Sequence, residues 1–408
     1  MKRNKKLRLQ IVLLSLACVL LAVDGLFFMP KILKFSWDLN LRRNEIICAH
    51  DGIDSFDIFD RKVSSEQFCG WPRPDKPNET KGNREYVHAY PPWHTAVFWW
   101  YGSVSKNACI IIMLGIYLCL FIWICQWTFN KMQYSDAEHC ISDVLFLLAM
   151  MMYSFDYLFL TLNYGILLLG CSCLLYNALE KKNEILAGIA FSLLMIKPQI
   201  GALFMIPLVI NRNYKTIVIA GLLCVLETLF TAWKLDKSPV ELILQIPKIG
   251  APYFKGYIAQ MFIDVIGPVG QYVSMAICAA IVSAGCFFLR NAKDVMVRFL
   301  PAIAFVPFWT YSQNHDWLFV LPCYIYIINN RQKWPRLYDL CFWLAILRAL
   351  VLSAHSHHCY SLGKLGIAYF SFLVVTSISC FMALLNENDK WDYRSVMLKL
   401  KTLGKGNG

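Results

Sequence analysis

Long apolar runs separated by short polar gaps form the main pattern of this sequence. Runs such as 110–127 and 365–385 reach or approach the roughly 20 residues that a helix needs to cross the hydrocarbon core of a bilayer. Their apolar residues are nearly continuous, whereas a half-buried soluble helix carries them on one stripe with a period of about 3.6 residues. The pattern predicts an all-α polytopic membrane protein. It excludes a soluble enzyme, a disordered protein and a nucleic-acid binder with a basic surface.

The first apolar run and the basic gaps indicate the orientation of the chain. Five Lys or Arg residues within 1–10 precede the apolar run 11–29, which predicts a first membrane helix with a cytoplasmic N-terminus. The later gaps then alternate between the two sides. We expect the cytoplasmic gaps to be 130–139, 180–184, 211–215, 290–298 and 329–336, together with the basic tail 386–408. We expect the outer gaps to be 30–105, 156–163, 234–267, 311–316 and 355–364.

One apolar stretch, 185–210, lies between two basic gaps, and two gaps on one side require an even number of crossings. Lys197-Pro198 interrupts this stretch near its middle, where proline breaks a helix and disfavours helical geometry in the residue before it. A hairpin of two short helices, with Lys197 near the outer side, gives about 12 transmembrane helices in one domain, 1–408. A single kinked helix gives about 11 and an outer C-terminus, which the basic tail disfavours.

Charge and cysteine content add little to this picture. Only 16% of the residues are charged, against about 25% in soluble domains. The net charge of +12 comes from Lys and Arg in short polar gaps, where such residues set the orientation of a membrane protein. The charge therefore indicates no acidic partner. Most of the Cys residues lie within apolar runs, where Cys behaves as a small hydrophobic residue. Whether Cys48 and Cys69 pair outside the cytoplasm stays open.

Polar residues that could take part in catalysis or binding lie on the expected outer side. The first outer loop carries Asp51, Asp54, Asp57 and Asp60 at every third position, which would align them along one helix face. A carboxylate at the membrane surface can act as a general base toward a hydroxyl or can bind a divalent cation. An interfacial helix with a solvated acidic face is the alternative.

Three further outer positions are candidates. Tyr90 and His94 flank a Pro pair before an apolar stretch, and their alternative role is to anchor the chain at the interface. Lys197 lies within an apolar stretch, where it either binds a phosphate as a point charge or snorkels to the surface. His315 lies in a short turn between two apolar runs, where it either contacts a phosphate, relays a proton or is simply solvated.

The order of these motifs resembles a known family. Tyr90-Pro91-Pro92 closes the first outer loop, Asn163-Tyr164-Gly165 opens an apolar run, Lys197-Pro198 follows, and Ser312-Gln313-Asn314-His315 comes last. Over about residues 10–330 the chain is similar to the polyprenyl-phosphate-sugar glycosyltransferases of family 87. These have the GT-C fold and are related to mycobacterial phosphatidylinositol mannoside mannosyltransferases. The chain departs from the family where Gln313 replaces a usual Pro and where Thr161-Leu162 replaces Gly-Gln.

The resemblance implies a GT-C-type helix bundle and a metal-independent, inverting transferase without a cofactor. A first-loop Asp would be the catalytic base, with Asp54 favoured, then Asp57, then Asp51. His315 and Lys197 would bind the donor phosphate. The remaining substrate-binding candidates are Tyr90, His94, Asn163 and Asn314.

We therefore expect transfer of a hexose, with mannose favoured, from a polyprenyl-phosphate donor to a lipid or glycan acceptor. The enzyme would be a multi-pass plasma (inner) membrane protein among membrane lipids, with an extracytoplasmic site and no nucleic-acid partner. One alternative is a transporter or flippase of lipid-linked sugars, although the large outer loops and the absence of visible repeats disfavour it. Another is a membrane subunit with an inactive site.

Overall fold

The computed structural model describes residues 36–52, 90–132, 142–147, 161–250, 257–309, 318–353 and 362–387, and within these ranges the chain is helical without a strand. The N-terminal helices are α2 (Trp37–His50), α5 (Pro92–Val97), η2 (Trp99–Ser103), α6 (Lys106–Lys131), α8 (Gly165–Glu180), α9 (Glu184–Leu194), α10 (Pro198–Ile210) and α11 (Tyr214–Leu235). They are followed by α12 (Pro239–Gly250), α13 (Tyr257–Ile266), α14 (Val269–Phe288), α15 (Val295–Trp309), α16 (Leu321–Asn329), α17 (Pro335–Ser353) and α18 (Leu362–Glu387). The predicted all-α class is confirmed.

Among the helices that the structure describes, three are long and apolar enough to cross a membrane, namely α6, α11 and α14. Their outward faces are apolar: Ile111 on α6 is 61% exposed and Leu226 on α11 is 61% exposed. Apolar side chains on the outside of a bundle match lipid rather than water, because a large exposed apolar surface is rare on soluble monomers. The chain is therefore a polytopic membrane protein, while the count of about 12 spans stays a prediction.

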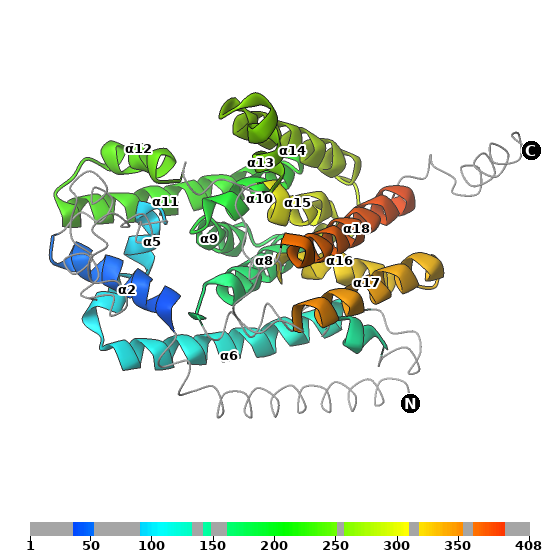
Figure 1. The fold of residues 1–408 in the computed structure, drawn as a ribbon. Helices are drawn as coiled ribbons and strands as arrows, with labels where there is room; N and C mark the ends of the chain where they lie inside the picture. Colours follow the sequence, from blue (N-terminus) through cyan, green and yellow to red (C-terminus); the bar gives the residue numbers. More distant parts are fainter. Residues whose placement is uncertain are drawn as a thin grey trace, which may run out of the picture.

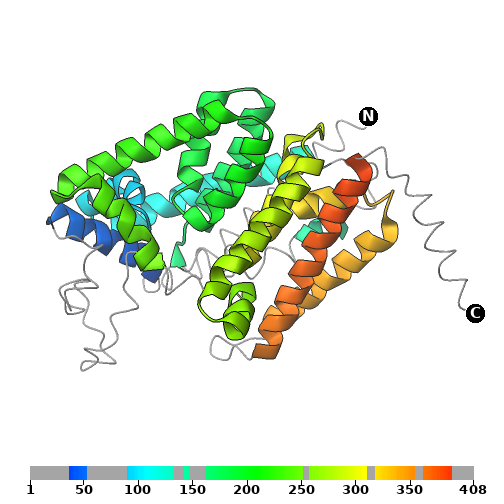
Figure 2. The ribbon, with the colours of Figure 1, turned by 90° about the horizontal axis from the view of Figure 1, so that it is seen from above.

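The helices form two groups (Figure 2). The first group contains α6, α8, α9 and α11, with α2, α5 and η2 at one end (Figure 1). The second group contains α14 to α18, and α10 joins the groups because it packs against α14 and α15.

The predicted hairpin within 185–210 is confirmed. Helix α9 ends at Leu194 and α10 begins at Pro198, so Lys197 lies at the turn. Both ends of the hairpin return to the same end of the bundle, because Glu184 and Lys215 form an ion pair of 3.1 Å. The alternative of a single kinked helix is wrong. The two helices are only about 16 and 20 Å long, too short to cross a hydrocarbon core of about 30 Å on their own.

The described parts of four gaps expected on the cytoplasmic side meet at one end of the bundle. At one end Lys131 pairs with Glu180 and with Asp294, and Asn329 donates to the carbonyl of Lys131. These residues come from gaps expected on the cytoplasmic side or border them. At the other end Thr231 donates to the carbonyl of Pro92, between α11 and α5. Which end faces the cytoplasm stays a prediction.

Helices α8, α9 and α10 stop short of the ends of α6 and α11 that we expect on the outer side. Lys197 comes 13 residues after Glu184, which places it about 20 Å from the cytoplasm-assigned end. Tyr117 on α6 lies about 21 Å from Lys131 along its helix and donates to the carbonyl of Asn163 at 2.6 Å. Since α6 extends about 39 Å and α11 about 33 Å, the turns at Asn163 and Lys197 lie roughly 10 to 20 Å below the outer end of the bundle.

The second predicted outer loop, 234–267, contains α12 and α13. Leu242 of α12 is buried in a small cluster with Ala49 and Ala232, whereas Val240 and Leu244 are exposed. This amphipathic arrangement suits a helix at the membrane interface, as we expect for the outer loops.

Candidate active site

The N-terminal helix α2 buries a charged face. Asp38, Arg42 and Glu45 follow the spacing i, i+4 and i+7, which places them on one side of the helix. All three are buried, with exposed fractions of 8%, 6% and 0%. Arg42 lies between the two carboxylates: its Nη1 donates to Glu45 Oε1, and its Nη2 lies 3.6 Å from Asp38 Oδ1. Asp38 also stands in the first turn, where the helix dipole stabilises a negative charge.

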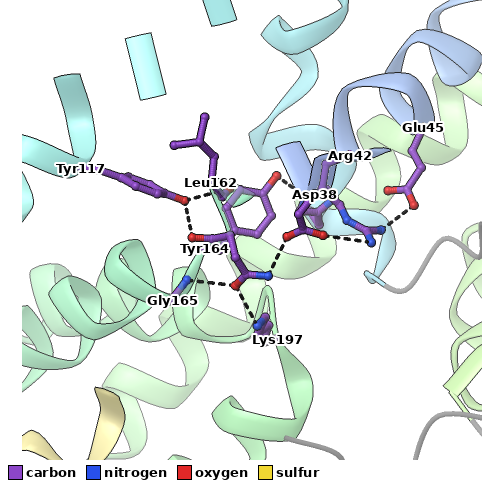
Figure 3. A network of polar contacts seen from close by, with 10 residues as sticks. Asp38, Arg42, Glu45, Tyr117, Leu162, Tyr164, Gly165 and Lys197 are labelled. Carbon is purple, nitrogen blue, oxygen red and sulfur yellow. Dashed lines mark hydrogen bonds and ion pairs between the residues drawn. The ribbon is translucent and has the colours of Figure 1, made fainter. Parts of the chain in front are cut away.

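Asn163 links this face to the hairpin, and Figure 3 shows Asp38 and Lys197 within this polar network. Its Nδ2 donates to Asp38 Oδ2 at 2.6 Å, and its Oδ1 accepts from Lys197 Nζ at 3.3 Å. The same Oδ1 accepts from the backbone N–H of Gly165 at 3.2 Å, which ties the side chain to the first turn of α8. Leu162, just before Asn163, has a left-handed φ of 53°. Such a conformation is costly for a branched side chain, so the surrounding contacts must hold this turn in place.

Lys197 is a buried cation at the turn of the hairpin. Its side chain lies at the N-terminus of α10, and the residue is only 4% exposed. Pro198 takes the first helical position, where its missing N–H costs nothing. The positive end of α10 and the Lys197 ammonium together favour an anion at this position. Trp309, the last residue of α15, donates to the carbonyl of Gln199, so the described end of α15 also meets this turn.

An aromatic wall closes the site beside α2. His94 is fully buried, stacks on Tyr90 with ring centroids 4.6 Å apart, and shares a hydrogen bond of 2.9 Å between its Nε2 and the Tyr164 hydroxyl. Phe98 stacks on Tyr164 at 4.6 Å. The Arg42 guanidinium lies 4.6 Å from the centre of the Tyr90 ring, a cation–π contact. The wall therefore fixes the same arginine that lies between the two carboxylates.

Burial and charge act in opposite directions on this face. Burial raises the pKa of Glu45 to about 7, although the ion pair with Arg42 lowers it in part. Burial lowers the pKa of Arg42, but the carboxylates of Glu45 and Asp38 outweigh this effect and raise it overall. Arg42 therefore stays charged under any condition in which the protein is folded.

The structure brings four of the sequence-predicted residues together around Asp38: Tyr90, His94, Asn163 and Lys197. Asp51 is elsewhere. It caps the C-terminus of α2, is exposed, and lies 13 residues from Asp38, which is about 20 Å along the helix.

The other predicted residues, Asp54, Asp57, Asn314 and His315, lie outside the described residues. Their roles stay predictions. Within the described ranges no group of three or more His, Cys, Asp or Glu side chains could hold a metal ion. Metal independence also stays a prediction.

Asp38 itself is absent from the sequence-predicted site. The row of four Asp later in the same loop is the more conspicuous feature of the sequence. The signal for Asp38 is its spacing to Arg42 and Glu45, an alternation of charge at i, i+4 and i+7 close behind the first apolar run. A stripe of this kind is usually solvated. Here it is buried, and only the fold shows this.

Comparison with known protein families gives a match. The family model described as glycosyltransferase family 87 matches residues 88–312, more than half of the chain. The matched region contains Tyr90, His94, Asn163 and Lys197, and α2 with Asp38 precedes it. No curated protein and no solved structure matches the chain.

Proposed function

The chain belongs to glycosyltransferase family 87, and on this premise we propose that it transfers a hexose from a polyprenyl-phosphate donor to a hydroxyl group of a lipid or glycan acceptor. Mannose is the first candidate sugar. The reaction takes place at the end of the bundle that carries α2 and α5, which we assign to the outer side of the plasma (inner) membrane. The observation that carries this proposal is the hydrogen-bonded chain from Asp38 through Asn163 to Lys197.

The depth of the site supports a lipid-linked donor. Asn163 and Lys197 lie roughly 10 to 20 Å below the outer ends of α6 and α11. A water-soluble nucleotide sugar would have to leave water to reach this level. A polyprenyl phosphate carries its sugar at the membrane surface while its chain stays in the lipid, so it reaches the level without that cost.

Asp38 is the general base of the proposed reaction. The acceptor hydroxyl attacks the anomeric carbon as its proton passes to Asp38, and the bond from that carbon to the donor phosphate breaks. Asn163 holds Oδ2 of Asp38, while Oδ1 makes no hydrogen bond to any residue that the structure describes. One carboxylate oxygen is thus fixed and the other is available for the proton. Attack from the side opposite the leaving phosphate inverts the configuration, and a general base contributes about 10²–10⁴-fold.

Lys197 stabilises the departing phosphate. The phosphate gains negative charge as the sugar leaves, and a buried ammonium at a helix N-terminus is placed to compensate that charge. His315 is the second phosphate ligand of the proposal. Its support is the contact between Trp309 and Gln199, which brings the chain to Lys197 six residues before His315.

One observation favours a second function. Discontinuous helices that meet inside the membrane, as α9 and α10 do at Lys197, are also common in transporters. The alternative is therefore a transporter or flippase of lipid-linked sugars.

One experiment separates the two functions. The purified protein in lipid nanodiscs is supplied with radiolabelled polyprenyl-phosphate mannose, and with the glucose and galactose analogues in parallel. A hydroxyl-bearing lipid extract serves as acceptor. Transferase activity appears as labelled acceptor and free polyprenyl phosphate. In proteoliposomes, movement of the intact donor between leaflets without any transfer would support the transporter and contradict the transferase.

A further inference from the structure

Arg42 poses a problem for a base at Asp38. An opposite charge within about 4–6 Å stabilises a carboxylate and lowers its pKa by about 1–3 units. A guanidinium that bound Asp38 with both nitrogens would also occupy both carboxylate oxygens. Both oxygens of the base would then be blocked. The buried geometry shows how the protein prevents this second contact, although the charge itself stays close to Asp38.

Glu45 holds the same guanidinium on its other side. Arg42 Nη1 makes a close charge-assisted hydrogen bond to Glu45 Oε1, whereas Arg42 Nη2 stays 3.6 Å from Asp38 Oδ1, outside hydrogen-bond distance. Glu45 has an exposed fraction of 0% and lies one helical turn beyond Arg42. The Tyr90 ring, 4.6 Å from the guanidinium, limits its movement further.

We propose that Glu45 is a positioning residue for the transfer reaction: it keeps the Arg42 guanidinium from closing onto Asp38, so that Asp38 Oδ1 remains available to the acceptor hydroxyl. The inference rests on the proposed function, because it concerns the base of that reaction. Glu45 does not touch substrate. It acts through Arg42.

Several other titratable groups surround this pair, and the test must allow for them. They are Asp38 and Cys48 on α2, Tyr90 before α5, His94 on α5, Tyr101 on η2, Tyr117 on α6, Tyr164 before α8 and Lys197 before α10. Burial raises the pKa of the Cys48 thiol to about 11. The phenols ordinarily titrate near pH 10. Among these groups, Glu45 has a pKa that burial raises into the neutral range, to about 7.

The pH dependence of turnover tests the proposal. With a general base the rate rises as the base loses its proton, and the midpoint of this acid limb follows the pKa of the base. In Glu45→Gln the guanidinium loses its anionic partner and closes onto Asp38. Glu45 holds Arg42 only as an anion, and burial raises the pKa of Glu45 to about 7, so the wild-type acid limb contains the loss of this proton as well as that of the base. In the variant this step is gone, and we expect the acid limb to move to lower pH, with a lower plateau of kcat and an unchanged KM for the donor. In Arg42→Gln the cation is gone, and the acid limb moves up instead.

Shifts of the acid limb in opposite directions in Glu45→Gln and Arg42→Gln distinguish a positioning role from a loss of folded structure. A purely structural pair would lower activity in both variants at every pH without moving the limb, and that result overturns the proposal. Glu45→Asp, which is one methylene shorter, gives a smaller downward shift. If neither Glu45 variant folds, the pair is structural and the proposal is wrong. Glu184→Gln, which removes an exposed ion pair with Lys215 at the opposite end, is the matched control and keeps the wild-type profile.

Two further measurements separate this proposal from the function on which it rests. If wild-type protein transfers no sugar from any polyprenyl-phosphate donor, the proposed function fails and the inference falls with it. If wild-type protein is active and Asp38→Asn is inactive, while Glu45→Gln leaves the acid limb in place, only the positioning role of Glu45 is wrong.

Discussion

Asn163 joins the Asp38 carboxylate to the buried Lys197 ammonium, and its replacement by alanine is the most informative single change in the site. The side chain donates to Asp38 and accepts from Lys197 and from the Gly165 N–H. The first two bonds involve charged groups, and such bonds contribute about 1.5–3 kcal/mol each. Their loss leaves two buried charges without the amide between them. We expect Asn163→Ala to destabilise the protein by about 3 kcal/mol or more.

The same change should also lower turnover. Without Asn163, Oδ2 of Asp38 is no longer fixed, and a misplacement of about 1 Å can cost about 10²-fold in rate. We expect the transfer rate to fall by about that factor. The assays are thermal unfolding of the purified protein in detergent and transfer from a polyprenyl-phosphate sugar.

Asn183→Ala is the matched control for this change. Asn183 also accepts a backbone N–H at the start of a helix, from Leu186, but it lies at the opposite end of the bundle and is exposed. Loss of such a cap costs about 1 kcal/mol and should leave the transfer rate intact. If Asn163→Ala behaves like Asn183→Ala in both assays, the polar chain does not organise the site and the reasoning is wrong.

Three further predictions follow from the site and its surroundings. His315→Ala and Lys197→Gln should both raise the donor KM as well as lower kcat, because both residues are proposed to hold the phosphate; an unchanged KM in either variant would remove that residue from the phosphate site. Burial raises the pKa of Glu45 from 4.5 to about 7, so the folded protein keeps a proton that the unfolded chain releases in this interval. Stability should therefore fall as the pH rises from about 4.5 to 7, and Glu45→Gln should flatten this slope in thermal unfolding, whereas an equal slope in both proteins would contradict it. A cysteine at position 80 (Thr80→Cys) should react with an impermeant reagent in intact cells, and protection until lysis would reverse the orientation.

Part of the arrangement of the membrane helices is predictable from the sequence, because continuous apolar runs and basic gaps follow simple physical rules. The hairpin at Lys197 is the clearest case: two basic gaps around one apolar stretch, with a proline in its middle, already require the chain to turn back. These rules do not predict how deep within the membrane each turn of the chain lies. That α9 and α10 are too short to cross the membrane, and so place Lys197 within the bundle, is visible only in the structure.

The candidate site is predictable only in part. Tyr90, His94, Asn163 and Lys197 stand beside proline or at the ends of apolar runs, and such breaks in the pattern mark them. Asp38 lies in a segment that resembles an ordinary solvated helix. Its burial depends on contacts with residues more than 100 positions away, such as Asn163, and sequence spacing carries no signal for contacts of that range.

Transfer activity of three aspartate variants tests the central claim most directly. Asp38→Asn, Asp54→Asn and Asp57→Asn are purified in parallel, and donor binding and sugar transfer are measured for each. The account predicts that Asp38→Asn binds the donor normally but transfers sugar at least about 10²-fold more slowly. At most one of the other two variants shows a loss of transfer activity, and that loss is partial. A fully active Asp38→Asn beside an inactive Asp54→Asn or Asp57→Asn would place the base in the later Asp row and contradict the account.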